Sequence, residues 1–220
     1  MKNKHRPGSL LMMLGTALII GAVILAGYNL WSGYQAEKAA ADVLEQIELP
    51  PAVIPELGLI EVEYPDYILN PDMEMPTTEI DGYEYIGVLD IPHLELSLPI
   101  MSDWTYPQLQ IAPCRYVGTA YKGDMVLCGH NFQSHFGRLN ELSIGDTVTF
   151  TDVDGNVFDY TVVEVELLGS TAIEEMETGD WNLTLFTCTY GGRTRYTVRC
   201  SLDGDDVIIW DGAEKDEGKG

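Results

Sequence analysis

Basic residues are scarce in this chain, which has 12 Lys and Arg against 35 Asp and Glu among 220 residues and a net charge of −23 at pH 7. Lys2, Lys4 and Arg6 stand ahead of every acidic residue, and all of the acids fall between residues 37 and 220. A surface this acidic repels phosphate backbones, which argues against nucleic acid as a partner. The acid excess is instead typical of a domain kept soluble outside the cell.

Charge is absent altogether from residues 7–36. The apolar core of this stretch, residues 10–31, has 22 residues, and a helix of that length crosses about 30 Å of hydrocarbon. A cleaved signal peptide has a shorter apolar region of about 7–15 residues, so we predict a retained, single-pass signal anchor. Because the basic residues precede this span, we expect residues 1–9 to be a cytoplasmic tail and the body of the chain to be extracellular.

Cysteine and histidine are rare too, with four of each. Four cysteines in a chain of this length do not make a disulfide-stapled domain. We interpret Cys114, Cys128 and Cys200 as small buried side chains, although an even number of cysteines outside the cell leaves disulfides open. The few histidines restrict which side chain could serve as a general base.

Residues 32–80 separate the anchor from the rest of the chain. AEKAAADVLEQIE, residues 36–48, predicts that the helix of the anchor continues. Six prolines follow between residues 49 and 76. They predict an extended extracellular stalk or a strap over the domain, because proline breaks helices and cannot donate to a sheet.

From residue 81 to about residue 210 the sequence is a series of short strand patterns. The expected strands are YEYIGVLDIP, LELSLPIM, DMVLCGHN, a hairpin within DTVTFTDVDGNVFDYTVVEVELL, NLTLFTC and RTRYTVRCSL. Asp154-Gly155 is a strong turn signal in the hairpin. Helical signals are brief, in SHFGRLNEL and in STAIEEMETG, where Thr171 and Glu174 have capping-box spacing. This pattern predicts an all-β sandwich or barrel, and we expect residues 211–220 to be a disordered tail.

Cys188 is the candidate nucleophile, because it ends an apolar strand pattern. A thiol acts as a nucleophile only as the thiolate, so it needs a base or a positive charge beside it. His130 ends another apolar strand, directly after a glycine, and we expect the two side chains to meet at neighbouring strand ends. His5 precedes the membrane span, and His135 lies in a polar stretch where we expect a surface residue.

Three arginines, Arg193, Arg195 and Arg199, follow Cys188 on the next expected strand. The period of two along a strand places all three on one face. Acyl transfer at an amide builds negative charge on the carbonyl oxygen, and a positioned cation stabilises that charge. The alternative is a solvated strand face whose arginines pair with nearby acids.

These motifs resemble the sortase family of cysteine transpeptidases. TLFTC, residues 184–188, resembles the signature around the sortase nucleophile, and GHN, with its histidine 58 residues earlier, resembles the sortase histidine site. An arginine on the following strand completes the order, and the resemblance covers about residues 84–202. It implies a closed, eight-stranded β-barrel, nearest in pattern to class B or to the pilus-type class C.

The resemblance also implies roles for single residues. Cys188 matches the nucleophile and His130 the general acid and base. TRYTVR resembles the HRLLVR of pilus-assembling sortases, which places the catalytic arginine at Arg195, with Arg199 as the second choice. Three residues are expected to bind substrate: Thr187, Asn131 and Arg199.

By the same resemblance the protein would cleave a C-terminal sorting motif such as LPxTG, between Thr and Gly, in a surface protein or a pilin. Cys188 would hold the acyl group as a thioester until an amine of a cell-wall precursor or a pilin releases it. No cofactor and no metal is expected. One sortase class binds calcium near the loop that corresponds to residues 170–182, but we interpret the acids there as a solvated helical turn. Pilus sortases carry a lid, whereas we interpret LNPDMEMP, which contains Asp72, as a stalk.

Two alternatives come from other functional classes. One is a papain-like peptidase that uses Cys188, His130 and an asparagine such as Asn131, although papain-like nucleophiles begin a helix. The other is a non-catalytic adhesion module on a stalk, in which Cys188 is merely a buried thiol.

Overall fold

A computed structural model describes residues 7–50 and 65–204 of the chain. The basic residues before the anchor, most of the proline-rich segment and the expected C-terminal tail lie outside the described residues. The predictions made for those segments therefore stay predictions.

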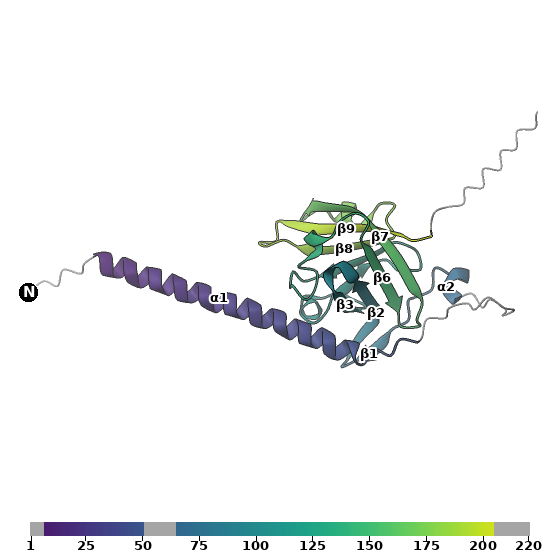
Figure 1. Cartoon of the computed structure of the whole chain (residues 1–220), viewed down its shortest axis with the longest axis horizontal. Helices are drawn as coiled ribbons and strands as arrows, with labels where there is room; N and C mark the ends of the chain where they lie inside the picture. Colours follow the sequence, from purple (N-terminus) through teal and green to yellow (C-terminus); the bar gives the residue numbers. More distant parts are fainter. Residues whose placement is uncertain (1–6, 51–64, 205–220) are drawn as a thin grey trace, which may run out of the picture.

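Eight strands close into a barrel (Figure 1). They are β2 (Tyr83–Ile91), β3 (Leu96–Met101), β4 (Cys114–Val117), β5 (Met125–Gly129), β6 (Thr147–Asp152), β7 (Val157–Gly169), β8 (Leu183–Cys188) and β9 (Thr194–Leu202). Their order is β2-β3-β4-β5-β8-β9-β7-β6, and β6 pairs back with β2 to close the ring. A ninth strand, β1 (Thr78–Ile80), extends the sheet beside the start of β2. The predicted closed, eight-stranded barrel is confirmed.

Alternation along each strand separates the inside of the barrel from its outer face. Leu185 on β8 and Val198 on β9 belong to the large apolar cluster that fills the barrel. Their neighbours Phe186 and Cys128 belong instead to a second apolar cluster. Because successive side chains of a strand point to opposite faces, this second cluster marks the outer face of β5 and β8.

The remaining elements are short. They are α2 (Asp66–Leu69), α3 (Tyr106–Leu109), α4 (Ile173–Glu177) and two single 3₁₀ turns, η1 (Pro92–Leu94) and η2 (Leu139–Glu141). The predicted hairpin between β6 and β7 is confirmed, and Gly155 in its turn has a φ of +84°. The predicted capping box is wrong, because α4 begins after Ala172 without a side-chain cap, so neither Thr171 nor Glu174 holds its first turn.

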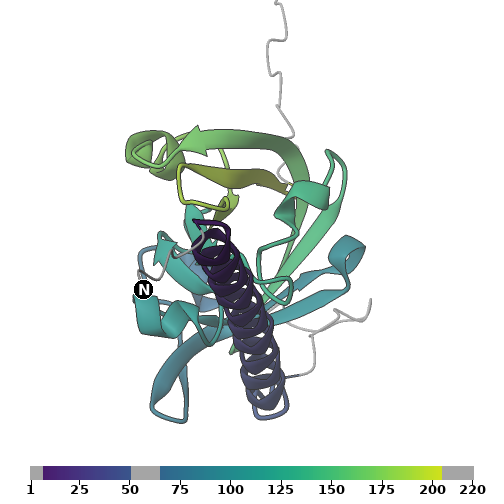
Figure 2. The same ribbon diagram turned by 90° about the vertical axis from the view of Figure 1, so that its left-hand side faces the viewer.

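The longest element, α1 (Pro7–Leu44), continues well past the expected end of the span at Trp31. Among the described residues it is the one helix long and apolar enough to cross a membrane. Its N-terminal half extends away from the barrel, and its C-terminal turns lie across it (Figures 1 and 2). Ala36, Ala40 and Val43, on one face of the helix, are buried there. The first part of the expected stalk is therefore a helix packed on the domain.

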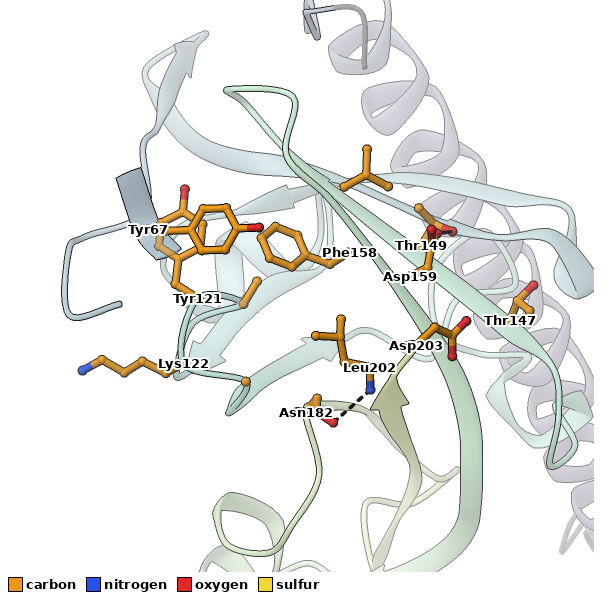
Figure 3. A pocket seen from close by; sticks show the side chains of 13 residues that line it. Tyr67, Tyr121, Lys122, Thr147, Thr149, Phe158, Asp159, Asn182, Leu202 and Asp203 are labelled. Atoms are coloured by element: carbon orange, nitrogen blue, oxygen red, sulfur yellow. Dashed lines mark hydrogen bonds between the residues drawn. The ribbon is translucent and has the colours of Figure 1, made fainter. Parts of the chain in front are cut away.

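The segment that leads into β1 is fixed to the side of the barrel. Tyr67 of α2 stacks on Tyr121 with ring centroids 4.6 Å apart, and Asp72 forms an ion pair with Lys122 at 2.9 Å. Tyr67, Tyr121 and Lys122 line a cavity of about 640 Å³ that includes none of the candidate catalytic residues (Figure 3). Residues 65–76 thus pack as a strap beside this cavity.

Gly87 permits the closure of the barrel, because β2 meets both β3 and β6 at this residue. A Cβ atom on Gly87 would stand 2.1 Å from the backbone oxygen of Thr151 on β6. We predict that Gly87→Ala lowers the free energy of unfolding by about 2–3 kcal/mol, the cost of overpacking without room to relax.

Gly82→Ala is the matched control for this substitution. Gly82 also has a positive φ, +81°, but a Cβ atom there meets nothing within 4 Å. Its replacement should cost about 1 kcal/mol of backbone strain alone. Urea denaturation of the two variants would contradict a steric role for Gly87 if both lose the same stability.

Candidate active site

Two parallel strands bring Cys188 and His130 together. β5 and β8 are paired in register from Met125 opposite Leu183 to Gly129 opposite Thr187. His130 directly follows β5, and Cys188 is the last residue of β8. Because neighbouring strands lie about 4.8 Å apart, the next position in this register sets the two residues side by side. The strand ends meet as the sequence predicts.

A third strand adds Arg195 on the other side of Cys188. β9 runs antiparallel to β8, and the last pair of their register joins Cys188 to Arg195. Cys188 keeps the alternation of Phe186, so it points to the outer face of the barrel. Directly opposed residues of an antiparallel pair share a face, so Arg195 points to that face as well. Cys188 is therefore flanked by one candidate residue from each neighbouring strand.

Among the four cysteines only Cys188 is exposed, and all four are free thiols. Burial raises the pKa of Cys128 and of Cys200 to about 12 and raises that of Cys114 further. These three thiols are buried as expected, and their raised pKa values keep them protonated. Cys188 is thus the thiol that a substrate can reach.

The glycine before His130 has a packing role. A Cβ atom on Gly129 would lie 2.6 Å from the ring of Phe136.

The His130 ring stacks on Phe132, with centroids 4.0 Å apart and planes 14° from parallel. Burial lowers the pKa of His130, and the Asn131 side chain raises it in part. A lowered pKa favours the neutral imidazole, which can accept a proton.

The expectation that His135 lies on the surface is wrong, because its side chain is fully buried. It lies behind Phe132, with ring centroids 5.5 Å apart. Ala36 of α1, which is itself 1% exposed, lies beside it, and the Ala36 backbone raises the pKa of His135 in part. The helix therefore covers a histidine that the polar sequence around it had suggested was exposed. Burial, and to a lesser extent His130, lowers the pKa of His135 to about 4.

The Arg195 guanidinium is held from two directions. Its Nη1 donates to the backbone oxygens of Gly169, the last residue of β7, and of Ser170, which follows it. Its Cζ lies 5.7 Å from the centre of the Phe186 ring. Its Nε is buried and has no hydrogen-bond partner in the described part of the chain. The guanidinium is thus fixed at the site through Nη1 and through its contact with Phe186.

Arg199 lies on the same face, four positions further along β9, but it is only 2% exposed. Its Nε donates to Glu166 at 3.0 Å, and its Nη1 donates to Thr184 Oγ1 and to the backbone oxygen of Met176. Its Nη2 donates to the backbone oxygen of Glu175. Arg199 therefore holds α4 against the barrel, and these contacts favour a structural role over the substrate-binding role expected from the sequence.

Thr187 is also buried, and its Oγ1 donates to the backbone oxygen of Gly129 at 2.9 Å. This bond joins β8 to β5 at the last pair before the two candidate catalytic residues. It favours a positioning role for Thr187 over direct contact with a substrate. Asn131 remains beside His130 and partly exposed, so its expected role stays a prediction.

Sequence reasoning missed a row of aromatic rings beside Arg195. Tyr116 on β4 contacts Phe186 edge-on, with centroids 5.4 Å apart. Trp104 packs against Tyr116 at 5.6 Å and against Tyr106 at 5.9 Å. Trp104 is 39% exposed and Tyr106 is 79% exposed, so the row opens to solvent. These rings come from separate elements, and no local pattern in the sequence links them.

Within residues 7–50 and 65–204, no group of three or more His, Cys, Asp or Glu side chains is arranged to hold a metal ion.

Comparison with known proteins gives consistent matches. A model of the Sortase domain matches residues 89–203, just over half of the chain. "Sortase A" of Bacillus anthracis is 27% identical over 211 residues, covering 92% of this chain and 97% of that protein.

Solved structures share the fold. The Sortase D5 transpeptidase of Clostridium perfringens has a TM-score of 0.53 at 19% identity, covering 78% of this chain and 99% of that chain. Sortase C1 from Streptococcus agalactiae has a TM-score of 0.50 at 23% identity, covering 66% and 80%. A weaker match, to Sortase C1 of GBS Pilus Island 1, has a TM-score of 0.48 at 21% identity and covers 54% of this chain and 64% of that chain.

The buried His135 predicts acid sensitivity. Its pKa falls from an ordinary 6.5 to about 4 in the folded chain. Between these pH values the unfolded chain binds a proton that the folded chain does not, so the free energy of unfolding falls as the pH falls, by about 1.4 kcal/mol per unit. His135→Gln should remove this slope. Chemical denaturation from pH 7 to pH 4 measures it, and equal slopes in the two proteins would contradict a neutral, buried His135.

Proposed function

This chain belongs to the sortase family, and we propose that it is a membrane-anchored cysteine transpeptidase in which Cys188, His130 and Arg195 carry the chemistry. The observation that supports this assignment is the meeting of three strand ends. β5, β8 and β9 place an imidazole, an exposed thiol and a guanidinium at adjacent positions on one face.

The first half of the reaction forms a thioester. The Cys188 thiol passes its proton to the neutral His130, and the thiolate attacks the scissile carbonyl carbon, whose oxygen becomes an oxyanion. The oxyanion then collapses, the C–N bond breaks, and the protonated His130 gives its proton to the leaving amine. The acyl group stays on Cys188, and His130 is left neutral, the form that its lowered pKa favours.

The second half returns the enzyme to its starting state. An acceptor amine attacks the thioester carbonyl and loses a proton to the neutral His130. The C–S bond breaks, a new amide leaves, and the Cys188 thiolate takes the proton back from His130.

Arg195 stabilises the charge on the carbonyl oxygen in both halves. Its guanidinium is already fixed by the Gly169 and Ser170 carbonyls, so little ordering is needed when substrate binds. Arg199 is less suited to this role, since Glu166, Thr184 and the α4 backbone occupy its buried guanidinium.

The donor substrate is a surface protein or pilin with an LPxTG-like motif, cleaved between Thr and Gly. The aromatic row from Phe186 through Tyr116 to Trp104 offers an apolar surface next to Arg195 for the Leu and Pro of such a motif. The acceptor is an amine of a cell-wall precursor or of a pilin. The enzyme acts outside the cell, with α1 as its single membrane span and its N-terminus in the cytoplasm.

The alternatives fit the geometry less well. A papain-like nucleophile begins a helix, whereas Cys188 ends a strand. A non-catalytic adhesion module would have no need for an exposed thiol between an imidazole and a fixed guanidinium.

The proposed activity is tested with the full-length protein in detergent micelles, LPxTG-type peptides and a small amine. The wild type should convert the peptide into the amine adduct. Cys188→Ala should abolish both cleavage and transfer and remain folded, because it removes one exposed sulfur at a strand end. Mass spectrometry of the wild type should find the acyl group on Cys188. Cys128→Ala is the control, and loss of turnover in that variant with retention in Cys188→Ala would contradict the assignment.

The two arginines should separate activity from stability. Arg195→Lys should lower turnover about 100-fold, since an ammonium cannot replace a fixed guanidinium at an oxyanion. Arg199→Lys should instead lower the free energy of unfolding by about 2 kcal/mol, because buried charge-assisted bonds are lost. Turnover and urea denaturation are measured on both variants. A larger loss of turnover at Arg199 in a protein of unchanged stability would reverse the two roles.

A further inference from the structure

A second cavity, of about 380 Å³, shares His130 with the candidate active site. One of its walls is α1, through Tyr34 and Glu37, and the opposite wall is the loop that begins at His130. Tyr190, in the turn between β8 and β9, completes it. Ser134 joins the two walls, because its Oγ donates to the Gly33 carbonyl at 3.3 Å. This helical wall lies outside residues 89–203, the part of the chain that matches the Sortase domain.

The charge in this cavity comes from one side chain. Glu37 is the only carboxylate among the residues that line the cavity, and none of them is a lysine or an arginine. The other ionisable groups in the lining are His130 and two tyrosines. None of the ion pairs within the described residues involves Glu37. An exposed carboxylate with no cationic partner among the described residues is thus held on the helical wall of the cavity, opposite the loop that begins at His130.

The other lining groups suit a small organic cation. Tyr34 and Tyr190 are both exposed aromatic residues, and an ammonium group over an aromatic face is attracted by the ring. The remaining polar lining groups, such as Asn131, are uncharged and offer oxygen acceptors. A carboxylate and aromatic rings around one cavity make a site for a cation, and the imidazole beside them makes it a site for a cation that gives up a proton.

We infer that this cavity binds the acceptor, with Glu37 as the residue that holds its primary ammonium group. The inference rests on the proposed function, because only the second half of that reaction uses an amine acceptor. The ammonium loses one proton to solvent and becomes an amine within reach of His130. As its nitrogen attacks the thioester carbonyl of Cys188, it loses a second proton to His130, and the C–S bond breaks. α1 is then part of the active site as well as the membrane anchor.

The test compares three acceptors on the full-length enzyme in detergent micelles with an LPxTG-type peptide as donor. Triglycine carries an α-ammonium group, Nα-acetyl-lysine amide carries a side-chain ammonium group, and hydroxylamine is uncharged at neutral pH. Glu37→Gln should raise the KM for an ammonium acceptor about fivefold, as expected for loss of an exposed ion pair. It should leave the KM for hydroxylamine and the rate of peptide cleavage without acceptor unchanged. The ammonium acceptor with the larger change identifies which kind of amine the site takes.

Asp42→Asn is the matched control. Asp42 lies on the same helix and carries the same charge, but it does not line the cavity. This variant should behave as the wild type with all three acceptors. The effect of Glu37→Gln should also shrink at high salt, because ions screen an exposed pair.

Three results would overturn the inference while the proposed function stands. They are an unchanged KM for both ammonium acceptors in Glu37→Gln, an equal rise for hydroxylamine, and an equal rise in Asp42→Asn. Failure of the proposed function is separate, because it shows as no cleavage of any peptide by the wild type before an acceptor is added. That result would overturn the inference together with the function on which it rests.

Discussion

The parallel pairing of β5 with β8 is the constraint on which the rest of the site depends. The register of these strands ends at Gly129 and Thr187, and the Thr187 hydroxyl bonds across that last pair. A shift of one residue would turn His130 or Cys188 to the other face of the sheet. Parallel strands can be neighbours only through a long crossover, and here the connection contains β6, β7 and α4. The whole middle of the chain is therefore needed to bring two residues side by side.

The electrostatics of the site depends on how deeply two arginines of β9 are buried in an otherwise acidic protein. Few cations are available in a chain of net charge −23, and β9 carries two of them at different depths. Arg199 is buried with Glu166 and with the α4 backbone, which fixes the loop above the sheet. The first residue of that loop, Ser170, gives Arg195 one carbonyl, and Gly169 at the end of β7 gives it another. One arginine thus stabilises the segment that orients the other, and only the outer one lies opposite the thiol.

Much of this arrangement could be predicted from the sequence, because the signals are local. Alternation predicts the strands of the barrel, and TLFTC and GHN place Cys188 and His130 at strand ends. The period of two also predicts that Arg195 and Arg199 share a face, but it contains nothing about α4, which covers only the second. His135 was misplaced for the same reason, because the helix that buries it is about 100 residues away in the sequence. What the sequence could not supply is contact between distant segments.

The continuous helix α1 contains both the predicted membrane span and the residues that pack on the barrel. A helix without a break transmits position, since each residue advances about 1.5 Å along a fixed axis. The predicted span ends at Trp31, and the burial of Ala36 and Ala40 against the barrel begins within two turns of it. In the proposed anchored protein, this packing would hold the domain at a set height and rotation relative to the span, with the His130 cavity reaching Asn29 and Leu30 in the last turn of the span. An anchor on a flexible stalk would leave both free, whereas packing of α1 on the barrel would fix how the site of the proposed anchored enzyme faces the membrane.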